Sequence, residues 1–275
     1  MIDLHLHTTA SDGRRTPAEL VRWSSIAGVT VMAVTDHDTT AAVAEVRALA
    51  AEAGIEAIPG IEITAVDAGR DVHMLGYFFD PDNEPLATFL STQREARVQR
   101  AEAIAARLGE LGMPIDLGQV LGRGRKQRGR SVGRPQIAQA MVRAGHVADM
   151  REAFDRWLGE GAPAFMPREG PSPEDVLAVV HEAGGIVSLA HPGRTRIDAR
   201  IESLRAAGLD AIEVYHPDHN RDDQARYRQV ANRLDFLVTG GSDFHGDTTH
   251  GLTPGSTTLP PEEWERLQAS VRSRD

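Results

Sequence analysis

Apolar and polar residues alternate over residues 2–7, where Ile2, Leu4 and Leu6 form the apolar side. A period of two is typical of a β-strand. Residues 16–19 (Thr-Pro-Ala-Glu) then supply an N-cap threonine, a proline at the first helical position and a glutamate that completes a capping box. The pattern therefore predicts a strand followed by a helix that stops at Gly28.

Strands and helices continue to alternate in both outer parts of the chain. Apolar runs predict strands over residues 31–35, 57–59 with 61–64, 72–79, 186–189, 211–215 and 236–240. Good helix formers predict a helix over 41–53, and residues 172–175 repeat the capped helix start. Such alternation predicts a parallel sheet with crossover helices, either doubly wound or closed into a barrel.

Residues 85–168 interrupt this pattern. Segments 86–111 and 134–144 have helical character and are each followed by a glycine, whereas no segment between them has the character of a strand. We therefore predict one barrel or sheet domain formed by residues 1–84 and 169–275. Residues 85–168 would form a helical insertion domain that starts and ends beside the active face and covers the active site.

Composition excludes several classes of protein. The 275 residues are 41% hydrophobic and 25% charged and include no cysteine, which excludes a disordered chain, a disulfide scaffold and a thiolate metal site. No apolar stretch approaches the roughly 18 residues that a membrane helix needs. Because a strand-like run begins at Ile2, we expect no signal peptide, a cytoplasmic location and no membrane partner. No obligate protein partner is evident, and a net charge of −10 argues against a nucleic-acid coat protein.

Histidines and carboxylates gather on or directly after the predicted strands, at His5, His7, His37, Glu62, His73, His191, His216, Asp243 and His245. The carboxyl ends of strands in a parallel sheet or barrel share one face, so these side chains should converge. Each residue has an ordinary alternative as a turn, cap or exposed strand residue. Their coincidence favours a multinuclear metal site, and imidazole and carboxylate ligands suit zinc, manganese or iron. His146 and His181, in or near predicted helices, should lie outside it.

Five motifs spread over nearly the whole chain resemble the PHP (polymerase and histidinol phosphatase) phosphoesterase family. They are DLHLHTTASDG at 3–13, TDHD at 35–38, PGIE at 59–62, AHP at 190–192 and GSDFHG at 241–246. The helical insertion after residue 77 resembles the subgroup of small-nucleotide phosphatases and 5′–3′ exoribonucleases. The resemblance implies a distorted, TIM-like (β/α)7 barrel that holds two to three divalent transition metal ions, of manganese, iron or zinc.

The resemblance also implies a role for each ligand. One metal would be held by His5, His7, Glu62 and Asp243. A second would share Glu62 and add His73 and His191, and a third would be held by Asp12, His37 and His245. All nine positions carry an allowed ligand type. Asp3, Asp36 and Asp38 are either carboxylates that orient the imidazoles or ordinary turn and cap residues.

Charge favours an anionic substrate at such a site. Three carboxylates and three divalent ions leave the pocket near +3 by simple counting, in a protein of net charge −10. Glu62 and Asp243 would serve catalysis by holding ions around a bridging hydroxide that attacks phosphorus. His245, or a water on the third metal, would help the leaving oxygen depart.

Arg134, Arg194 and His216 are candidate substrate contacts. Arg134 lies in the motif Val-Gly-Arg-Pro at 132–135, which matches the family, and a guanidinium binds phosphate bidentately. Arg194 and His216 could equally be solvated loop residues. Gln136 stands where the subgroup carries a histidine, which puts a substrate contact there in doubt. The basic run 123–130 has two interpretations. It is a lid that binds a second phosphate or the 5′ end of a short RNA, or it is a disordered loop, which its glycines favour.

The sequence therefore predicts a metal-dependent phosphoric ester hydrolase. Its substrate would be a small nucleotide, either a nucleoside monophosphate or a 3′,5′-bisphosphate. A 5′–3′ exoribonuclease acting on short RNA is the alternative within the same class. A metal-stabilised, non-catalytic binding module is the alternative of a different class.

Overall fold

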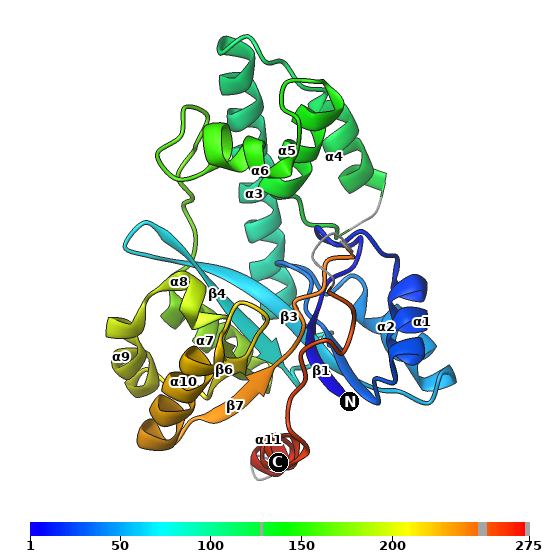
Figure 1. Cartoon of the computed structure of the whole chain (residues 1–275), viewed down its shortest axis with the longest axis vertical. Coiled ribbons are helices and arrows are strands. Elements are labelled where there is room, and N and C mark those ends of the chain that lie inside the picture. Colours follow the sequence, from blue (N-terminus) through cyan, green and yellow to red (C-terminus); the bar gives the residue numbers. More distant parts are fainter. Residues whose placement is uncertain (127–128, 247–251, 273–275) are drawn as a thin grey trace.

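A computed structural model describes residues 1–126, 129–246 and 252–272. In these residues seven strands form one sheet in chain order. They are β1 (Ile2–Leu6), β2 (Val31–Val34), β3 (Glu56–Asp67), β4 (Arg70–Tyr77), β5 (Ile186–Leu189), β6 (Ala211–Tyr215) and β7 (Leu237–Gly240). A bridge between Leu6 and Phe244 brings the segment after β7 beside β1. The sheet is therefore a nearly closed, distorted barrel, as predicted (Figure 1).

Helices surround the barrel, and local capping signals mark the ends of several of them. They are α1 (Pro17–Ala27), α2 (Val43–Glu52), α7 (Pro173–Glu182), α8 (Pro192–Thr195), η2 (Asp198–Arg200), α9 (Ile201–Ala206), α10 (Arg221–Leu234) and α11 (Pro261–Arg272). Capping boxes start α1 at Thr16 and α7 at Ser172, and Gly28 adopts a left-handed conformation after α1. Among the described residues, no helix is both long and apolar enough to span a membrane.

The prediction of a wholly parallel sheet is wrong for the fourth strand. β3 continues through Gly60 as one strand of 12 residues, and β4 pairs antiparallel with both β3 and β5. Ala68 and Gly69 both have positive φ (49° and 80°), the geometry of a tight hairpin turn that needs no crossover helix. His73 consequently lies in the first half of β4, opposite Thr64.

The residues between β4 and α7 form helices with a hydrophobic core of their own. Their elements are α3 (Glu84–Glu110), α4 (Leu117–Lys126), α5 (Arg134–Arg143), α6 (Met150–Ala153) and the π-helical turn η1 (Phe154–Leu158). Leu86 and Leu90 of α3 pack in the barrel core, whereas Ile104 and Leu108 pack in the second core with Ile137. Helix α3 therefore connects the barrel to the insertion (Figure 1), and the exact domain limits stay a prediction.

The basic run 123–130 is described only in part. Residues 123–126 belong to α4, a helix that the sequence pattern did not indicate. Residues 127–128 lie outside the described residues. The choice between a lid and a disordered loop therefore stays a prediction.

A buried ion cluster ties the insertion to the barrel. Asp38 Oδ2 accepts hydrogen bonds from Arg97 Nε of α3 at 2.5 Å and from Arg168 Nη2 at 2.9 Å. Asp38 Oδ1 accepts one from the Thr64 N–H of β3 at 2.9 Å. Burial by itself would raise the pKa of Asp38, but the two guanidiniums outweigh it and hold this pKa well below its ordinary value.

Replacing Asp38 by asparagine should destabilise the protein by roughly 3–5 kcal/mol at pH 7, because two buried guanidiniums lose their counter-charge. Since folding lowers the pKa of Asp38, its stabilisation is present above the unfolded pKa of 3.8 and is lost as the pH falls below it. Urea denaturation should therefore show a difference between wild type and variant at pH 7 that shrinks in acid.

The matched control is Asp155→Asn, which removes an exposed carboxylate paired with Arg151 at 3.4 Å. Such a surface pair contributes less than about 1 kcal/mol. Equal stability of the Asp38 variant and the wild type at pH 7 would show that the cluster does not hold the insertion.

Candidate metal centre

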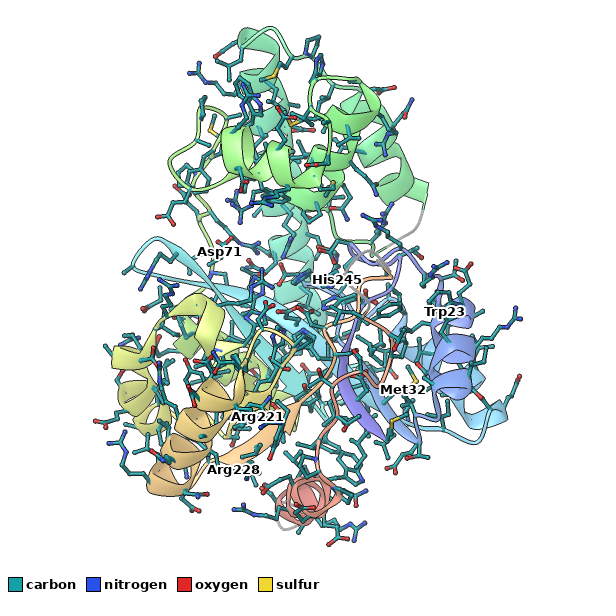
Figure 2. The ribbon with its side chains drawn as sticks, viewed as in Figure 1. Trp23, Met32, Asp71, Arg221, Arg228 and His245 are labelled. Carbon is teal, nitrogen blue, oxygen red and sulfur yellow. The ribbon has the colours of Figure 1, made fainter. Side chains whose placement is uncertain are left out.

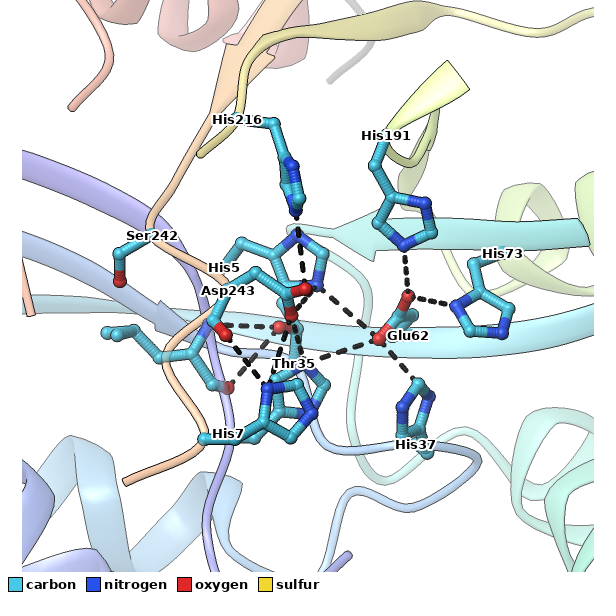
Figure 3. A network of polar contacts seen from close by, with 12 residues as sticks. His5, His7, Thr35, His37, Glu62, His73, His191, His216, Ser242 and Asp243 are labelled. Atoms are coloured by element: carbon cyan, nitrogen blue, oxygen red, sulfur yellow. Dashed lines mark hydrogen bonds and ion pairs between the residues drawn. The ribbon is translucent and has the colours of Figure 1, made fainter. Parts of the chain in front are cut away.

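The carboxylate of Glu62 lies at the centre of a buried cluster of imidazoles (Figure 3). Its Oε1 is 2.6 Å from His73 Nδ1 and 3.2 Å from His191 Nε2. Its Oε2 is 3.4 Å from His5 Nε2, 3.3 Å from His7 Nε2 and 3.1 Å from His37 Nδ1. His5 and His7 are fully buried, so the alternative that they are exposed strand residues is wrong.

Two further carboxylates complete the cluster. Asp243 Oδ1 is 3.2 Å from both His5 Nε2 and His7 Nε2. Asp12 lies 3.3 Å from His245 Nε2 and 3.6 Å from His37 Nε2. All nine residues named as ligands by sequence resemblance are therefore brought together, although they come from distant parts of the chain.

His146 and His181 lie outside the cluster, as the sequence predicts. His146 Nε2 contacts the Pro114 carbonyl oxygen at 2.7 Å, within the insertion. His181 Nε2 contacts Asp210 Oδ2 at 2.7 Å, near the amino ends of β5 and β6.

Several groups of these side chains have the spacing of a metal site. In each group the ligand atoms lie within 4.8 Å of one another, and the groups are His7–Asp12–His37–His245, His5–His7–Glu62–Asp243, His37–Glu62–His73 and His5–Glu213–His216. The first contains the set predicted for the third metal, and the second is the set predicted for the first. For the second metal, the prediction combines Glu62 and His73 with His191, whereas the third group combines them with His37. His191 nevertheless faces Glu62 Oε1, the same oxygen that His73 faces.

Orphaned nitrogen atoms test whether metal ions fit this cluster. Among the described residues, His7 Nε2, His37 Nδ1 and His73 Nδ1 are buried without a hydrogen-bond partner, although oxygens of Glu62 lie 2.6–3.3 Å away. A buried polar atom without a partner costs roughly 1–3 kcal/mol. A divalent transition metal ion would accept lone pairs from both the imidazoles and the carboxylates, so the donor set fits such ions.

Without ions, the buried carboxylates raise the pKa values of two of the imidazoles. Burial lowers the pKa of His5, but Glu213, Asp243 and Glu62 outweigh it and raise this pKa well above its ordinary value. The same competition raises the pKa of His7 to about 10. Burial prevails at His37 and His191 and lowers their pKa values to about 3 and about 4. Metal ions would replace the protons on His5 and His7, so metal binding should release protons and strengthen as the pH rises.

Glu213 is a functional candidate that the sequence analysis missed. Its Oε1 accepts a hydrogen bond from His5 Nδ1 at 2.9 Å, and its Oε2 accepts one from the His191 backbone N–H at 2.7 Å. The first bond directs the His5 Nε2 lone pair toward Glu62 and Asp243, the geometry of a metal-ligating histidine. The available signal was a glutamate inside the apolar run of β6.

Asp3, Asp36 and Asp38 do not orient the imidazoles directly, contrary to one of the two sequence interpretations. Asp3 accepts hydrogen bonds from the Ser242 N–H at 2.9 Å and its hydroxyl at 2.7 Å, beside Asp243. Asp36 accepts them from the Thr8 N–H at 2.8 Å and the Ser11 hydroxyl at 2.6 Å. These two aspartates therefore hold the loops that carry Asp243 and Asp12, and Asp38 pairs with arginines.

A cavity of about 850 Å³ lies between the cluster and the insertion. Its lining includes the candidate ligands of the barrel, here called the metal wall, and four arginines of the insertion, here called the arginine wall: Arg97, Arg100, Arg134 and Arg168. Among the described residues, Asp71 and Asp38 are the carboxylates that pair with these four arginines, which leaves a surplus of two positive charges. Figure 2 shows Asp71 and His245 at the level where the barrel meets the insertion.

The three candidate substrate contacts all line this cavity. Arg134 Nη2 is 3.2 Å from Asp71 Oδ2, and its Nη1 donates to the Leu158 carbonyl oxygen at 3.4 Å. Arg194 is half exposed, with Nη1 3.7 Å from Asp243 Oδ2. His216 is buried, and its Nε2 is 3.3 Å from the same oxygen. His216 thus lies closer to the candidate ligands than the sequence analysis implied.

Known proteins resemble this chain over nearly its full length. Residues 3–116 match the PHP domain family. The chain is 34% identical over 280 aligned residues to the 3′,5′-nucleoside bisphosphate phosphatase of Chromobacterium violaceum, covering 98% of this chain and 97% of the relative. It is 35% identical over 250 residues to a 5′–3′ exoribonuclease of Haemophilus influenzae, covering 88% and 89%.

A solved structure extends the similarity to the fold. A Bifidobacterium adolescentis protein assigned as a metal-dependent phosphoesterase superimposes on the chain with a TM-score of 0.88. The two are 35% identical, and the match covers 97% of this chain and 95% of that one.

Glu213→Gln should weaken metal binding by roughly 10–100-fold, because an amide cannot accept hydrogen bonds from both His5 and the His191 N–H. Titration of the metal-free protein with Mn²⁺ measures the effect, and circular dichroism verifies the fold. Glu102→Gln, on an exposed position of α3, is the matched control. Affinity for Mn²⁺ equal to that of the wild type would show that Glu213 does not orient His5.

Proposed function

The chain belongs to the PHP domain family of metal-dependent phosphoesterases, and we propose that it hydrolyses phosphate monoesters of small nucleotides at a centre of up to three divalent metal ions. A nucleoside 3′,5′-bisphosphate is the substrate that the cavity supports best, ahead of a nucleoside monophosphate. The alternative of a non-catalytic binding module is set aside, because all nine candidate ligands are present and the relatives of this chain are named as enzymes.

The proposed ligand sets follow the family pattern. His5, His7, Glu62 and Asp243 hold one ion, Glu62 with His73 and His191 a second, and Asp12, His37 and His245 a third. Manganese, iron or zinc would each accept these ligands. Ions bound there supply an activated water as nucleophile and stabilise negative charge on the transferring phosphoryl group.

The side chains around the ions have distinct tasks in this proposal. Glu62 would be shared by two ions, Asp243 would hold one of them, and Glu213 keeps His5 oriented. His245 is about one-third exposed in the cavity and faces Asp12, which makes it the candidate that helps the leaving oxygen depart. Arg194 and His216, beside Asp243, are the candidates that contact the ester.

The charge of the arginine wall is the observation that supports a substrate with two phosphates. A monoester with one phosphate would use only the metal wall, which would leave the surplus of two positive charges on the insertion without an anion. A second phosphate on the same nucleotide would satisfy that surplus. In this proposal residues 85–168 form the domain that covers the active site, residues 1–84 and 169–275 form the barrel, and the enzyme acts in the cytoplasm.

A 5′–3′ exoribonuclease acting on short RNA is the second candidate. The observation that favours it is the 35% identity to the Haemophilus influenzae exoribonuclease. In this alternative the arginine wall would bind the 5′-phosphate of the RNA while the first phosphodiester lies at the metal wall. The two candidates therefore share one site and differ in the length of the preferred substrate.

Phosphate release in the presence of Mn²⁺ tests the proposal. Adenosine 3′,5′-bisphosphate should be hydrolysed with a higher kcat/KM than AMP or a 5′-phosphorylated trinucleotide. Glu62→Gln should reduce kcat by more than about a hundredfold while the fold survives, because two ions lose a shared charge. Preference for the trinucleotide would favour the exoribonuclease. Less than one equivalent of transition metal after growth in metal-replete medium would contradict the metal centre.

Arg134→Ala tests the second phosphate site. The variant should lose roughly 2–4 kcal/mol in kcat/KM for the bisphosphate, because a charge-assisted contact to a desolvated phosphate is removed. The loss for p-nitrophenyl phosphate, which has one phosphate, should be much smaller. Metal content and melting temperature should be nearly unchanged.

Arg156→Ala is the matched control, since Arg156 is exposed on the same insertion and pairs with Glu152 at 2.5 Å. A variant at Arg134 that is less stable but keeps its full kcat/KM would show a different role. Arg134 would then only support the fold through Asp71 and Leu158.

A further inference from the structure

The loop that carries Asp12 is held from two sides. On the barrel side, Asp36 accepts hydrogen bonds from Thr8 and from the Ser11 hydroxyl at 2.6 Å. On the insertion side, the Ser131 N–H donates to the Ala10 carbonyl oxygen at 2.9 Å. The Ser11 carbonyl oxygen, one residue before Asp12, also faces the insertion. The position of Asp12 therefore depends on both parts of the chain.

Gln136 makes a close side-chain contact between the insertion and this loop. Its Nε2 donates to the Ser11 carbonyl oxygen at 2.7 Å, whereas Arg130 Nη2 reaches the same oxygen only at 3.5 Å. Its Oε1 accepts a hydrogen bond from the Gly133 N–H at 2.8 Å, at the start of α5. One amide group thus joins the first turn of α5 to the peptide that precedes Asp12.

That peptide sets the direction of the Asp12 carboxylate. Ser11 Oγ donates to Asp12 Oδ1 at 3.3 Å, and this carboxylate faces His245 and His37 at 3.3 and 3.6 Å. These three residues are the proposed ligands of the third metal. The other proposed ligand sets do not contain Asp12, and their contact with it is through His7, whose Nδ1 lies 3.8 Å from Asp12 Oδ1. A disturbance at Gln136 should therefore reach the third metal selectively.

We propose that Gln136 is a positioning residue, through which the insertion fixes Asp12 for the third metal. The inference rests on the proposed function for the existence of that metal, but it concerns metal binding and needs no particular substrate. It gives the insertion a second task beside covering the cavity. It also gives Gln136 a role other than the substrate contact that its place after Arg134-Pro135 suggested.

Titration of the metal-free enzyme with Mn²⁺ alone tests the proposal. Gln136→Met keeps the length of the side chain and removes both hydrogen bonds. It should bind the first two ions like the wild type and the third at least about tenfold more weakly. At limiting Mn²⁺ kcat should fall and excess Mn²⁺ should restore it, while KM for adenosine 3′,5′-bisphosphate stays within about twofold.

Two further variants separate positioning from folding. Gln136→His offers one acceptor and one donor nitrogen, as the amide does, and should recover affinity for the third ion. Gln119→Met makes the same change at an exposed position of α4 and should bind Mn²⁺ like the wild type.

Three results would overturn the proposal. One is that Gln136→Met binds all three ions like the wild type. Another is that this variant raises KM alone, which would make Gln136 a substrate contact. The third is that the wild type itself binds only two ions, which would remove the metal that Gln136 is proposed to serve but would leave a two-ion phosphoesterase centre intact.

Discussion

The carboxylate of Glu62 is the charge around which the barrel loops are arranged. It is 1% exposed and lies within 3.4 Å of imidazole nitrogens from five histidines. A charge buried this deeply is unfavourable by several kcal/mol unless partners surround it. The partners come from β1, from β4 and from the segments after β1, β2 and β5, so this single charge is satisfied only when the sheet curls into its barrel.

Backbone strain accumulates around the same charge. Asp38, His191 and Asp243 all have positive φ, at 51°, 28° and 49°. Each such conformation costs on the order of 1–3 kcal/mol and persists only where neighbouring contacts enforce it. The contacts are present: two arginines hold Asp38, Glu213 holds the His191 N–H, and Asp3 holds the residue before Asp243. The strained positions therefore form part of the preorganisation of the centre.

The sequence allowed most of the centre to be predicted, because its ligands are marked by motifs at strand ends and helix starts are marked by caps. It did not reveal that β4 is antiparallel, since this depends on a turn at Ala68-Gly69 that resembles any other loop. Glu213 was missed because it points inward from the middle of a strand. Arg97 and Arg168 were missed because an arginine in or beside a helix is ordinarily solvated, and only the fold buries them against Asp38.

The two walls of the cavity differ in the origin of their charge, and this difference shapes what the site can select. The histidines and carboxylates of the metal wall attract an anion only when protons or metal ions are bound, so the charge of this wall depends on pH and metal supply. The arginines of the arginine wall, on the insertion, are charged at every physiological pH. A nucleotide with one phosphate can use one wall, against repulsion from a protein of net charge −10. A nucleotide with two phosphates gains from both walls at once. In the proposed function, a preference for the doubly phosphorylated substrate would therefore need no contact to the base.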